Sequence, residues 1–219
     1  MTCIKKRQVK DPGSAITHFI GMLMAIFAAV PLLILAAHED GPIYVVSFLI
    51  FALSMILLYA ASTSYHTFDI SARVNRVLKK LDHCMIYVMI AGSYTPICLL
   101  VLDRRSGLFL LTLIWALAAA GVLFKLLWVN CPKWVSSVLY IGMGWTCVLT
   151  FGQLYENLTS KEFGWLLAGG IIYTIGGVIY ALKVPILRTI HENFGNHEIF
   201  HLFVMGGSAC HFVVMYLLA

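Results

Sequence analysis

Residues 12–38 read PGSAITHFIGMLMAIFAAVPLLILAAH and contain no Asp, Glu, Lys or Arg. A helix of about 20 predominantly apolar residues spans roughly 30 Å of hydrocarbon, so this stretch is long enough to cross a membrane. Six further windows without these charged residues follow, at 41–68, 83–102, 106–124, 134–155, 163–182 and 199–219. The sequence therefore predicts an all-α fold in which seven transmembrane helices form an integral membrane bundle.

The composition of the chain favours the same class. Of its 219 residues, 61% are hydrophobic and 11% are charged, whereas about 25% are charged in an average soluble protein. We expect a single domain over residues 1–219, because the turns between the windows are too short for a folded lobe. Its spans are predicted at about 14–37, 43–66, 82–102, 107–129, 134–155, 163–183 and 197–218.

A basic run, KKRQVK at residues 5–10, precedes the first window and raises the alternative of a secretory signal peptide. The apolar core of such a signal is about 7–15 residues long. The first window is longer than that and contains Pro31. We therefore interpret it as a span that stays in the mature protein.

Lys and Arg are divided unevenly between the two ends of the predicted helices. If the amino terminus lies inside, three basic residues face outward: Arg104, Arg105 and Lys161. Twelve face the cytoplasm: Lys5, Lys6, Arg7, Lys10, Arg73, Arg76, Lys79, Lys80, Lys125, Lys133, Lys183 and Arg188. Because basic loops stay on the cytoplasmic side, we expect a cytoplasmic amino terminus and an external carboxy terminus. Such short loops form no groove for nucleic acid, so we expect no nucleic-acid partner.

Ionisable side chains inside apolar spans are costly, and each one is a candidate functional residue. In the expected topology His66 ends the second span and Asp82 begins the third. His197 and His201 begin the seventh span. Four side chains that can bind a metal therefore lie at a similar depth near the cytoplasmic face.

The spacing of these histidines is typical of a metal site. His197 and His201 are four residues apart, so their side chains lie on one helical face about 6 Å apart. That is the usual arrangement of two zinc ligands. His66 completes a set of three and leaves a fourth position for water, and Ser62 lies one turn deeper on the face of His66. We interpret the group as a metal site rather than as hydrogen-bonded structural histidines.

Other histidines and the cysteines receive different interpretations. His211 lies about 15 Å farther along a helix than His201, too far to share its ion. His18 and His83 are expected to be structural, with outer contacts to the metal site as the alternative. The six cysteines form no C-x-x-C pair. We expect them to pack as small apolar residues rather than to form disulfides or a thiolate site.

The string HEIFH at residues 197–201 matches the H-E-x-x-H pattern of zinc metalloproteases. Proteases of that kind need a soluble cleft and a third ligand downstream. In the metzincin extension a Gly and a His are required where this chain has Val204 and Gly207. Glu198 also points about 100° away from His197 around a helix. We therefore expect Glu198 not to act as a catalytic base, and we reject the protease interpretation.

Three separated motifs carry a family resemblance. They are S-x-x-x-H at Ser62 and His66, LDHCMIYVMIAGSYTP at 81–96 and NHEIFHLFVMGGSACHF at 196–212. In this order they make the sequence similar to the hemolysin III family, within the superfamily of the progestin and adiponectin receptors and the alkaline ceramidases. The resemblance implies a bacterial plasma membrane protein with one Zn²⁺ near the cytoplasmic face. The residues implied around that ion are Ser62, His66, Asp82, His197 and His201.

The same resemblance implies two different activities. The ceramidase relatives are zinc amidases that act on lipids, whereas hemolysin III proteins carry a label of membrane lysis. We expect a zinc-dependent hydrolase of lipid amide or ester bonds, with membrane lipid as its partner. The alternatives are a lytic, pore-forming protein and a metal-stabilised receptor or membrane-state sensor without turnover. Asp82 is the expected proton acceptor, and Ser62 either stabilises an oxyanion or orients His66. The lipid substrate and the oligomeric state stay open at this point.

Overall fold

The computed structural model describes residues 9–182 and 195–219, and these residues form helices and turns without a strand. The elements are α1 (Pro12–Ala36), α2 (Pro42–Thr67), α3 (Ala72–Pro96), η1 (Ile97–Val101), α4 (Arg104–Leu127), α5 (Lys133–Gly144), η2 (Trp145–Thr150), α6 (Phe151–Asn157), α7 (Ser160–Leu182) and α8 (Asn196–Leu218). Within the described residues, seven helical stretches are long and apolar enough to cross a membrane. α3 with η1 forms the third, and α5, η2 and α6 form the fifth. The predicted all-α bundle of seven spans is confirmed.

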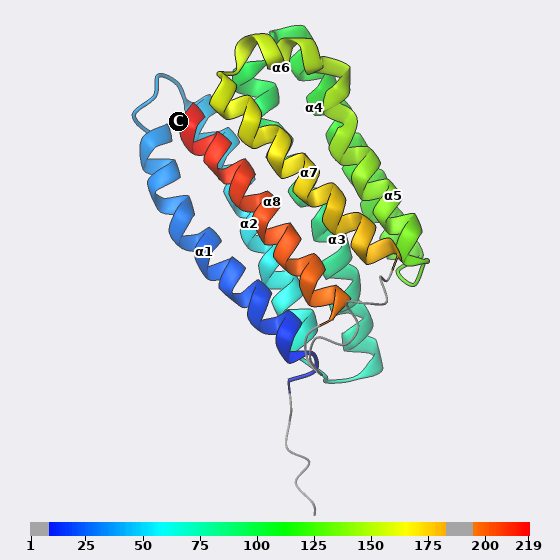
Figure 1. The fold of residues 1–219 in the computed structure, drawn as a ribbon. Coiled ribbons are helices and arrows are strands. Elements are labelled where there is room, and N and C mark those ends of the chain that lie inside the picture. The colour runs from blue at the N-terminus through cyan, green and yellow to red at the C-terminus, as the bar shows by residue number, and fades with distance from the viewer. Residues whose placement is uncertain (1–8, 183–194) are drawn as a thin grey trace, which may run out of the picture.

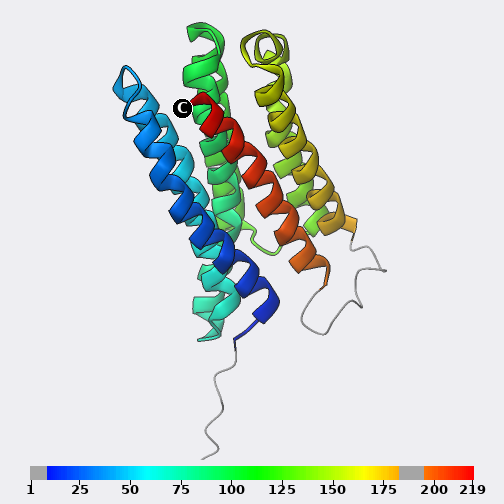
Figure 2. The same ribbon diagram turned by 60° about the vertical axis from the view of Figure 1, so that its left-hand side comes forward.

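The helices are arranged as a ring (Figures 1 and 2). α1 packs along α2, α2 along α3, and α3 along α4. On the other side α5 packs along α7 and α7 along α8, and α8 closes the ring against α1. The contact of α5 with α3 and α4 is slight. The chain enters α1 at one end of the bundle and leaves α8 at the other, as an odd number of spans requires (Figure 1).

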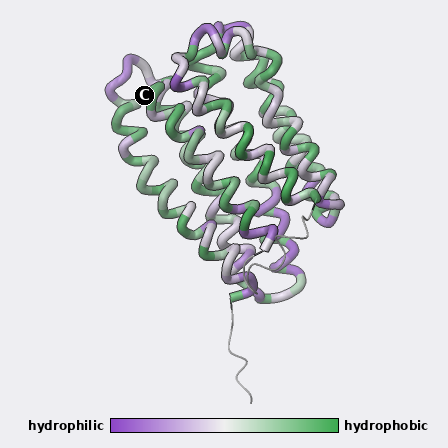
Figure 3. Tube along the Cα trace, viewed as in Figure 1, coloured by the Kyte–Doolittle hydropathy of each residue, from purple (hydrophilic) through white to green (hydrophobic). Residues whose placement is uncertain are grey.

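Large apolar side chains cover the outside of the bundle. Along α1, for example, Phe19, Met24, Phe27 and Val30 are exposed. Hydrophobic residues run along the helices, whereas hydrophilic residues gather mainly at their ends (Figure 3). So much exposed apolar surface would favour aggregation in water, but it matches the hydrocarbon of a bilayer. The chain is therefore an integral, multi-pass membrane protein.

Local sequence signals set the helix starts. Pro12 and Pro42 stand in the first turns of α1 and α2, where an N–H group has no helical partner to lose. Ser71 caps α3 by accepting the N–H of Val74 at 3.3 Å. Because of this cap, α3 begins at Ala72, well before the span predicted at 82–102. The polar first turns of α3 extend the helix beyond the apolar segment.

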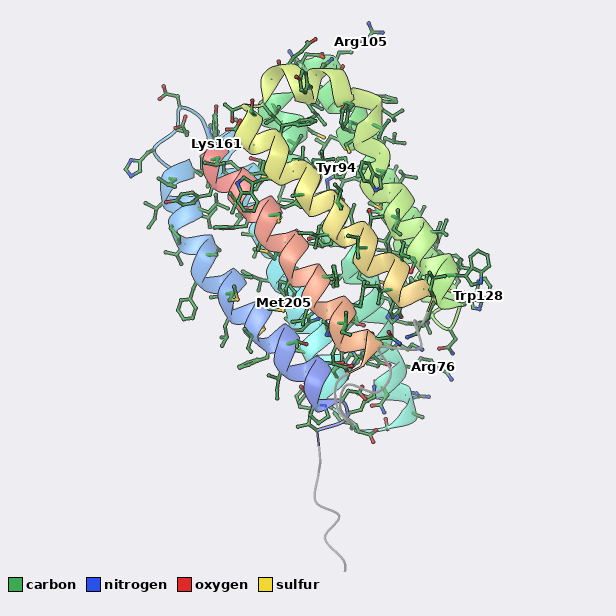
Figure 4. The ribbon with its side chains drawn as sticks, in the orientation of Figure 1. Arg76, Tyr94, Arg105, Trp128, Lys161 and Met205 are labelled. Carbon is green, nitrogen blue, oxygen red and sulfur yellow. The ribbon has the colours of Figure 1, made fainter. Side chains whose placement is uncertain are left out.

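Two of the spans contain segments that are not α-helical. Pro96 has no N–H group to donate to the preceding turn, and the chain continues after it as the π-helical segment η1. The fifth span changes to the 3₁₀ segment η2 after Gly144. Tyr94 points toward this break from α3 (Figure 4). Its hydroxyl donates to the carbonyl of Gly144 at 2.5 Å and accepts the N–H of Cys147 at 2.9 Å, so the break is hydrogen-bonded.

Most of the described basic residues lie at one end of the bundle, which we call the basic end. α1, α3, α5 and α8 begin there, and its basic residues include Lys10, Arg73, Arg76, Lys79, Lys80 and Lys133. Arg76 lies at this end, and Arg105 and Lys161 lie at the opposite one (Figure 4). Lys125, which was counted among the basic residues on the cytoplasmic side, also lies at this end, in the last turn of α4, where it is fully buried. Lys5, Lys6, Arg7, Lys183 and Arg188, and with them the end of the predicted span 163–183, lie outside the described residues.

Small residues pack inside the bundle. A Cβ atom added at Gly207 would lie 2.7 Å from the ring of Tyr173, and one at Gly176 would lie 2.6 Å from the Cβ atom of Phe203. The two glycines therefore allow α7 and α8 to approach closely. The described cysteines are free and mostly buried: Cys84, Cys98, Cys131, Cys147 and Cys210. Cys3 lies outside the described residues.

Candidate metal centre

Three histidines from two helices meet inside the basic end. His66 lies in the last turn of α2, and His197 and His201 lie in the first two turns of α8. One ring nitrogen of each lies within 4.8 Å of the other two. The three ring centroids are separated by 4.9, 5.2 and 4.5 Å. The structure thus brings together the three residues predicted as metal ligands.

The spacing of these nitrogens fits a zinc ion. The Nε2 atoms of His66 and His197 lie 3.1 Å apart. Two nitrogens that each lie about 2.0–2.1 Å from a tetrahedral Zn²⁺ are about 3.3–3.4 Å apart. Three imidazoles are also a common donor set for zinc with one position left for water. The residues present therefore suit the metal that the family resemblance implies.

Helix α1 and the residue just before it supply side chains to two of these rings, and the sequence did not predict this. The Oδ2 atom of Asp11 lies 2.9 Å from Nδ1 of His66. The Oγ1 atom of Thr17 lies 3.2 Å from Nδ1 of His201. Both contacts use Nδ1, and they leave Nε2 of each ring free to face the other histidines. The one sequence signal for Asp11 and Thr17 is that they flank the start of a span at the same depth as the predicted ligands.

The chain before α1 is fastened to the end of α2. The backbone N–H of Asp11 donates to the carbonyl of His66 at 2.9 Å, and that of Lys10 to the carbonyl of Thr67 at 3.4 Å. The Lys10 Nζ atom lies 3.5 Å from the centroid of the Tyr65 ring. Burial lowers the pKa of the Lys10 amino group, and the neighbouring Asp11 carboxylate opposes that shift. These contacts hold Asp11 beside His66.

Asp82, the predicted proton acceptor, belongs to α3 and lies next to the three histidines. Asp82 is 7% exposed, and it lines the same cavity as His197 and His201. Its Oδ2 atom lies 3.4 Å from Nδ1 of His83. That nitrogen also donates to the carbonyl of Lys79 at 2.9 Å, within its own helix. His83 therefore shares one proton between two acceptors and leaves the Asp82 carboxylate with unused acceptor capacity.

Ser62 and Glu198 are used in opposite ways. Ser62 is fully buried, and its hydroxyl has no hydrogen-bond partner among the described residues. Glu198 is engaged through both oxygens, since it accepts the hydroxyl of Ser14 and the N–H of Gly195, the latter at 2.8 Å. Glu198 thus caps the start of α8 and ties it to α1. It is not among the described residues that line the cavity.

The cavity beside the histidines lies mainly between α3, α5, η2, α6, α7 and α8, and single residues of α1, α2, η1 and α4 also line it. The empty space counted in it, which includes open space outside its mouth, is about 1660 Å³. Asp82, His197 and His201 line it at the basic end, and apolar residues such as Leu154 and Phe163 line it toward the other end. A long apolar wall with polar groups at one end suits an amphiphilic molecule.

Two further histidines line this cavity, and neither has a hydrogen-bond partner among the described residues. His18 of α1 is 3% exposed, and its ring stacks on that of His201 with centroids 3.5 Å apart and planes 9° apart. His211 lies farther along α8, where its ring centroid is 5.4 Å from that of Tyr173. His18 therefore contacts a predicted ligand directly, whereas His211 faces another part of the cavity.

The family model described as Haemolysin-III related matches residues 6–212. The chain belongs to this family. As a haemolysin-III-related protein it is 40% identical over 221 residues to Hemolysin-3 of Bacillus cereus, covering 100% of this chain and 96% of that protein. It is also 40% identical over 204 residues to the Hemolysin-3 homolog of Bacillus subtilis (strain 168), covering 93% and 91%.

More distant relatives of this haemolysin-III-related chain are animal proteins. The Adiponectin receptor protein of Drosophila melanogaster is 25% identical over 230 residues, covering 92% of this chain and 49% of that protein. The Monocyte to macrophage differentiation factor of Homo sapiens is 26% identical over 176 residues, covering 76% and 68%. The predicted membership of the hemolysin III family, within the progestin and adiponectin receptor superfamily, is confirmed.

Proposed function

We propose that this haemolysin-III-related protein is a zinc-dependent hydrolase of lipid amide or ester bonds. One observation carries the proposal: nitrogens of His66, His197 and His201 converge beside a cavity that Asp82 also lines. Buried histidines with nitrogens this close repel one another unless a proton or a metal lies between them. A site of this kind, at the polar end of a largely apolar cavity, is suited to an amphiphilic substrate.

The roles of the surrounding residues follow from their chemistry. Zinc held by three neutral imidazoles would lower the pKa of its bound water to about 7. The Asp82 carboxylate, which retains acceptor capacity, accepts the proton of the attacking water and returns it to the leaving group. The hydroxyl of Ser62, which has no partner among the described residues, would donate to the carbonyl oxygen of a substrate that reaches past the lining of the cavity, because Ser62 itself is not a lining residue. The alternative task for Ser62, orienting His66, is already served by Asp11.

The substrate class follows from the cavity. Its apolar wall toward the far end, which includes Leu154, Phe163 and Leu166, suits an acyl chain. The polar end would then hold the amide or ester carbonyl near Asp82. Because the bundle is surrounded by hydrocarbon, we expect acyl chains to enter sideways from the bilayer.

A lipidomic comparison tests this proposal. Cells that produce the wild type and cells that produce Asp82→Ala are compared at equal protein level. We expect one amide or ester lipid to accumulate in the variant while its free acid falls. The names of the two Bacillus relatives favour lysis as the second candidate function. Unchanged lipids, together with equal lysis of target membranes by both proteins, would replace the hydrolase with the cytolysin. Binding of a ligand that is coupled to a response of the protein, without turnover of that ligand, would indicate a sensor.

We propose further that the amino terminus faces the cytoplasm of a bacterial cell and that the carboxy terminus lies outside. The concentration of described Lys and Arg residues at the basic end supports this orientation. The histidine cluster would then lie near the cytoplasmic face. Reporter tags at the two termini should be detected on opposite sides of the plasma membrane. Detection of both tags on one side, or of the amino-terminal tag outside, would contradict the orientation.

A further inference from the structure

Helix α1 and Asp11, the residue just before it, carry none of the three expected metal ligands, yet together they contact two of them. Asp11 pairs with Nδ1 of His66 at 2.9 Å, and Thr17 pairs with Nδ1 of His201 at 3.2 Å. The ring of His18 covers the flat face of His201 with centroids 3.5 Å apart. The question is what these contacts do to the two imidazoles.

The hydrogen bonds of Thr17 determine which nitrogen of His201 is protonated. The Thr17 hydroxyl lies 3.0 Å from the carbonyl oxygens of Gly13 and Ser14, which only accept hydrogen bonds. A hydroxyl has a single proton, and both carbonyl contacts are shorter than the 3.2 Å contact with Nδ1 of His201, so we assign the proton to a carbonyl and a lone pair to the side that faces His201. The contact with Nδ1 is therefore a hydrogen bond only if Nδ1 carries the proton. In a neutral imidazole this leaves a lone pair on Nε2.

Asp11 has the same effect on His66. An ionised carboxylate has acceptors alone, so Nδ1 of His66 is the donor and Nε2 carries the lone pair. The Asp11 side chain is 43% exposed, and its position is secured by the backbone bond from Asp11 to the carbonyl of His66 at 2.9 Å. A metal ligand needs a deprotonated nitrogen, and partners on the other ring nitrogen fix that tautomer and the orientation of the ring.

We propose that Asp11 and Thr17 are positioning residues through which α1 fixes the tautomer and orientation of His66 and His201, so that both present Nε2 to the metal. This inference rests on the proposed zinc site, although it concerns residues outside the ligand set. It assigns to α1 a function in metal affinity, and it makes the short segment before α1 part of the site. His18 adds a face-to-face contact that limits rotation of the His201 ring.

The inference is tested by metal binding to the purified full-length protein. Zn²⁺ affinity is measured by competition with a chromogenic chelator, and Co²⁺ is added separately so that its visible absorption reports ligand geometry. Loss of such an outer partner typically weakens metal binding about 10–100-fold. We expect Asp11→Ala and Thr17→Val each to weaken Zn²⁺ binding within that range and to change the Co²⁺ spectrum.

Matched variants separate positioning from general damage. Thr17→Ser keeps the hydroxyl and should bind Zn²⁺ with an affinity close to that of the wild type. Asp69→Ala removes the same charge from an exposed loop at the same end, where Asp69 bonds to Asn75, and it should bind Zn²⁺ normally. Asp11→Asn keeps an acceptor oxygen without the charge and should give a smaller loss than Asp11→Ala. Circular dichroism and thermal unfolding confirm that each variant is folded.

Two results overturn the inference in distinguishable ways. If Asp11→Ala and Thr17→Val bind Zn²⁺ and Co²⁺ as the wild type does while His66→Ala does not, the metal site stands and the role of α1 is wrong. If the wild type itself binds neither metal, the proposed function fails and this inference fails with it. If Thr17→Val does not fold, Asp11→Asn and Asp11→Ala still test the proposal. Zn²⁺ affinities equal to that of the wild type in both Asp11 variants would contradict it.

Discussion

Two buried polar clusters lie at the basic end, and they differ in how completely their hydrogen bonds are satisfied. In the first, Nζ of Lys125 donates to Oγ of Ser136 at 2.6 Å and to Sγ of Cys131 at 3.0 Å. Cys131 and Ser136 also contact each other at 3.2 Å. In the histidine cluster, by contrast, the Nδ1 atom of His197 and the nearby Ser62 hydroxyl have no hydrogen-bond partner among the described residues.

This difference distinguishes a structural cluster from a candidate functional one. Each contains groups that are costly to bury in a membrane protein. The Lys125 cluster satisfies these groups internally and joins α4 to the start of α5, and none of its three residues lines the cavity. His197 and His201 of the histidine cluster line the cavity, and Nδ1 of His197 and the hydroxyl of Ser62 have no partner among the described residues. Unsatisfied buried groups of this kind require a reason, and a bound metal with its substrate supplies one.

The strongest test of this contrast concerns Asp82. Asp82→Asn removes the proton acceptor but no predicted ligand, and general acid–base catalysis typically contributes about 10²–10⁴-fold to the rate. We therefore expect turnover of the lipid identified by the lipidomic comparison to fall by that factor. Zinc content, measured on the same purified sample, should change little. Full turnover by Asp82→Asn would remove Asp82 from the mechanism.

The second test asks whether the Lys125 cluster is purely structural. Ser136→Ala removes the nearest acceptor of a fully buried amino group, and leaving such a donor unsatisfied costs about 1–3 kcal/mol of stability. We expect a lower unfolding temperature in detergent micelles with unchanged zinc content. Ser137→Ala is the matched control, because the Ser137 hydroxyl is buried without a partner among the described residues. A loss of zinc in Ser136→Ala at unchanged stability would erase the distinction between the two clusters.

The smallest expected effect concerns Glu198, which stands beside a predicted ligand but bonds as a structural group. Glu198→Ala removes the acceptor for Gly195 and Ser14, and loss of a helix cap costs about 0.5–2 kcal/mol. We expect zinc binding and turnover to persist despite this destabilisation. The opposite pattern, with Glu198 essential and Asp82 dispensable, would restore the protease-like interpretation of HEIFH.

The sequence was sufficient for the fold because a bilayer imposes a simple rule. Every span must be apolar and helical, so windows without charge located the seven helices. The rule says less about where helices begin and end. It did not anticipate that Ser71 would start α3 at Ala72, or that Lys125, within the predicted span 107–129, would be fully buried.

For the candidate site, sequence reasoning reached the residues that depend on helical spacing and depth. His197 and His201 share a face by their spacing, and His66 and Asp82 share their depth. Asp11 and Thr17 were missed because their contacts depend on which helices are neighbours. That α1 lies against both α2 and α8 follows from closure of the ring, and no local pattern in the sequence specifies it.

The central claim is most directly tested by elemental analysis of the purified protein. We expect about one zinc ion per chain in the wild type, because the described residues contain one group of candidate ligands, the three histidines. The double variant His197→Ala/His201→Ala should retain its helical content by circular dichroism and lose the metal. A wild type without bound metal, or a double variant with full zinc occupancy, would contradict the account.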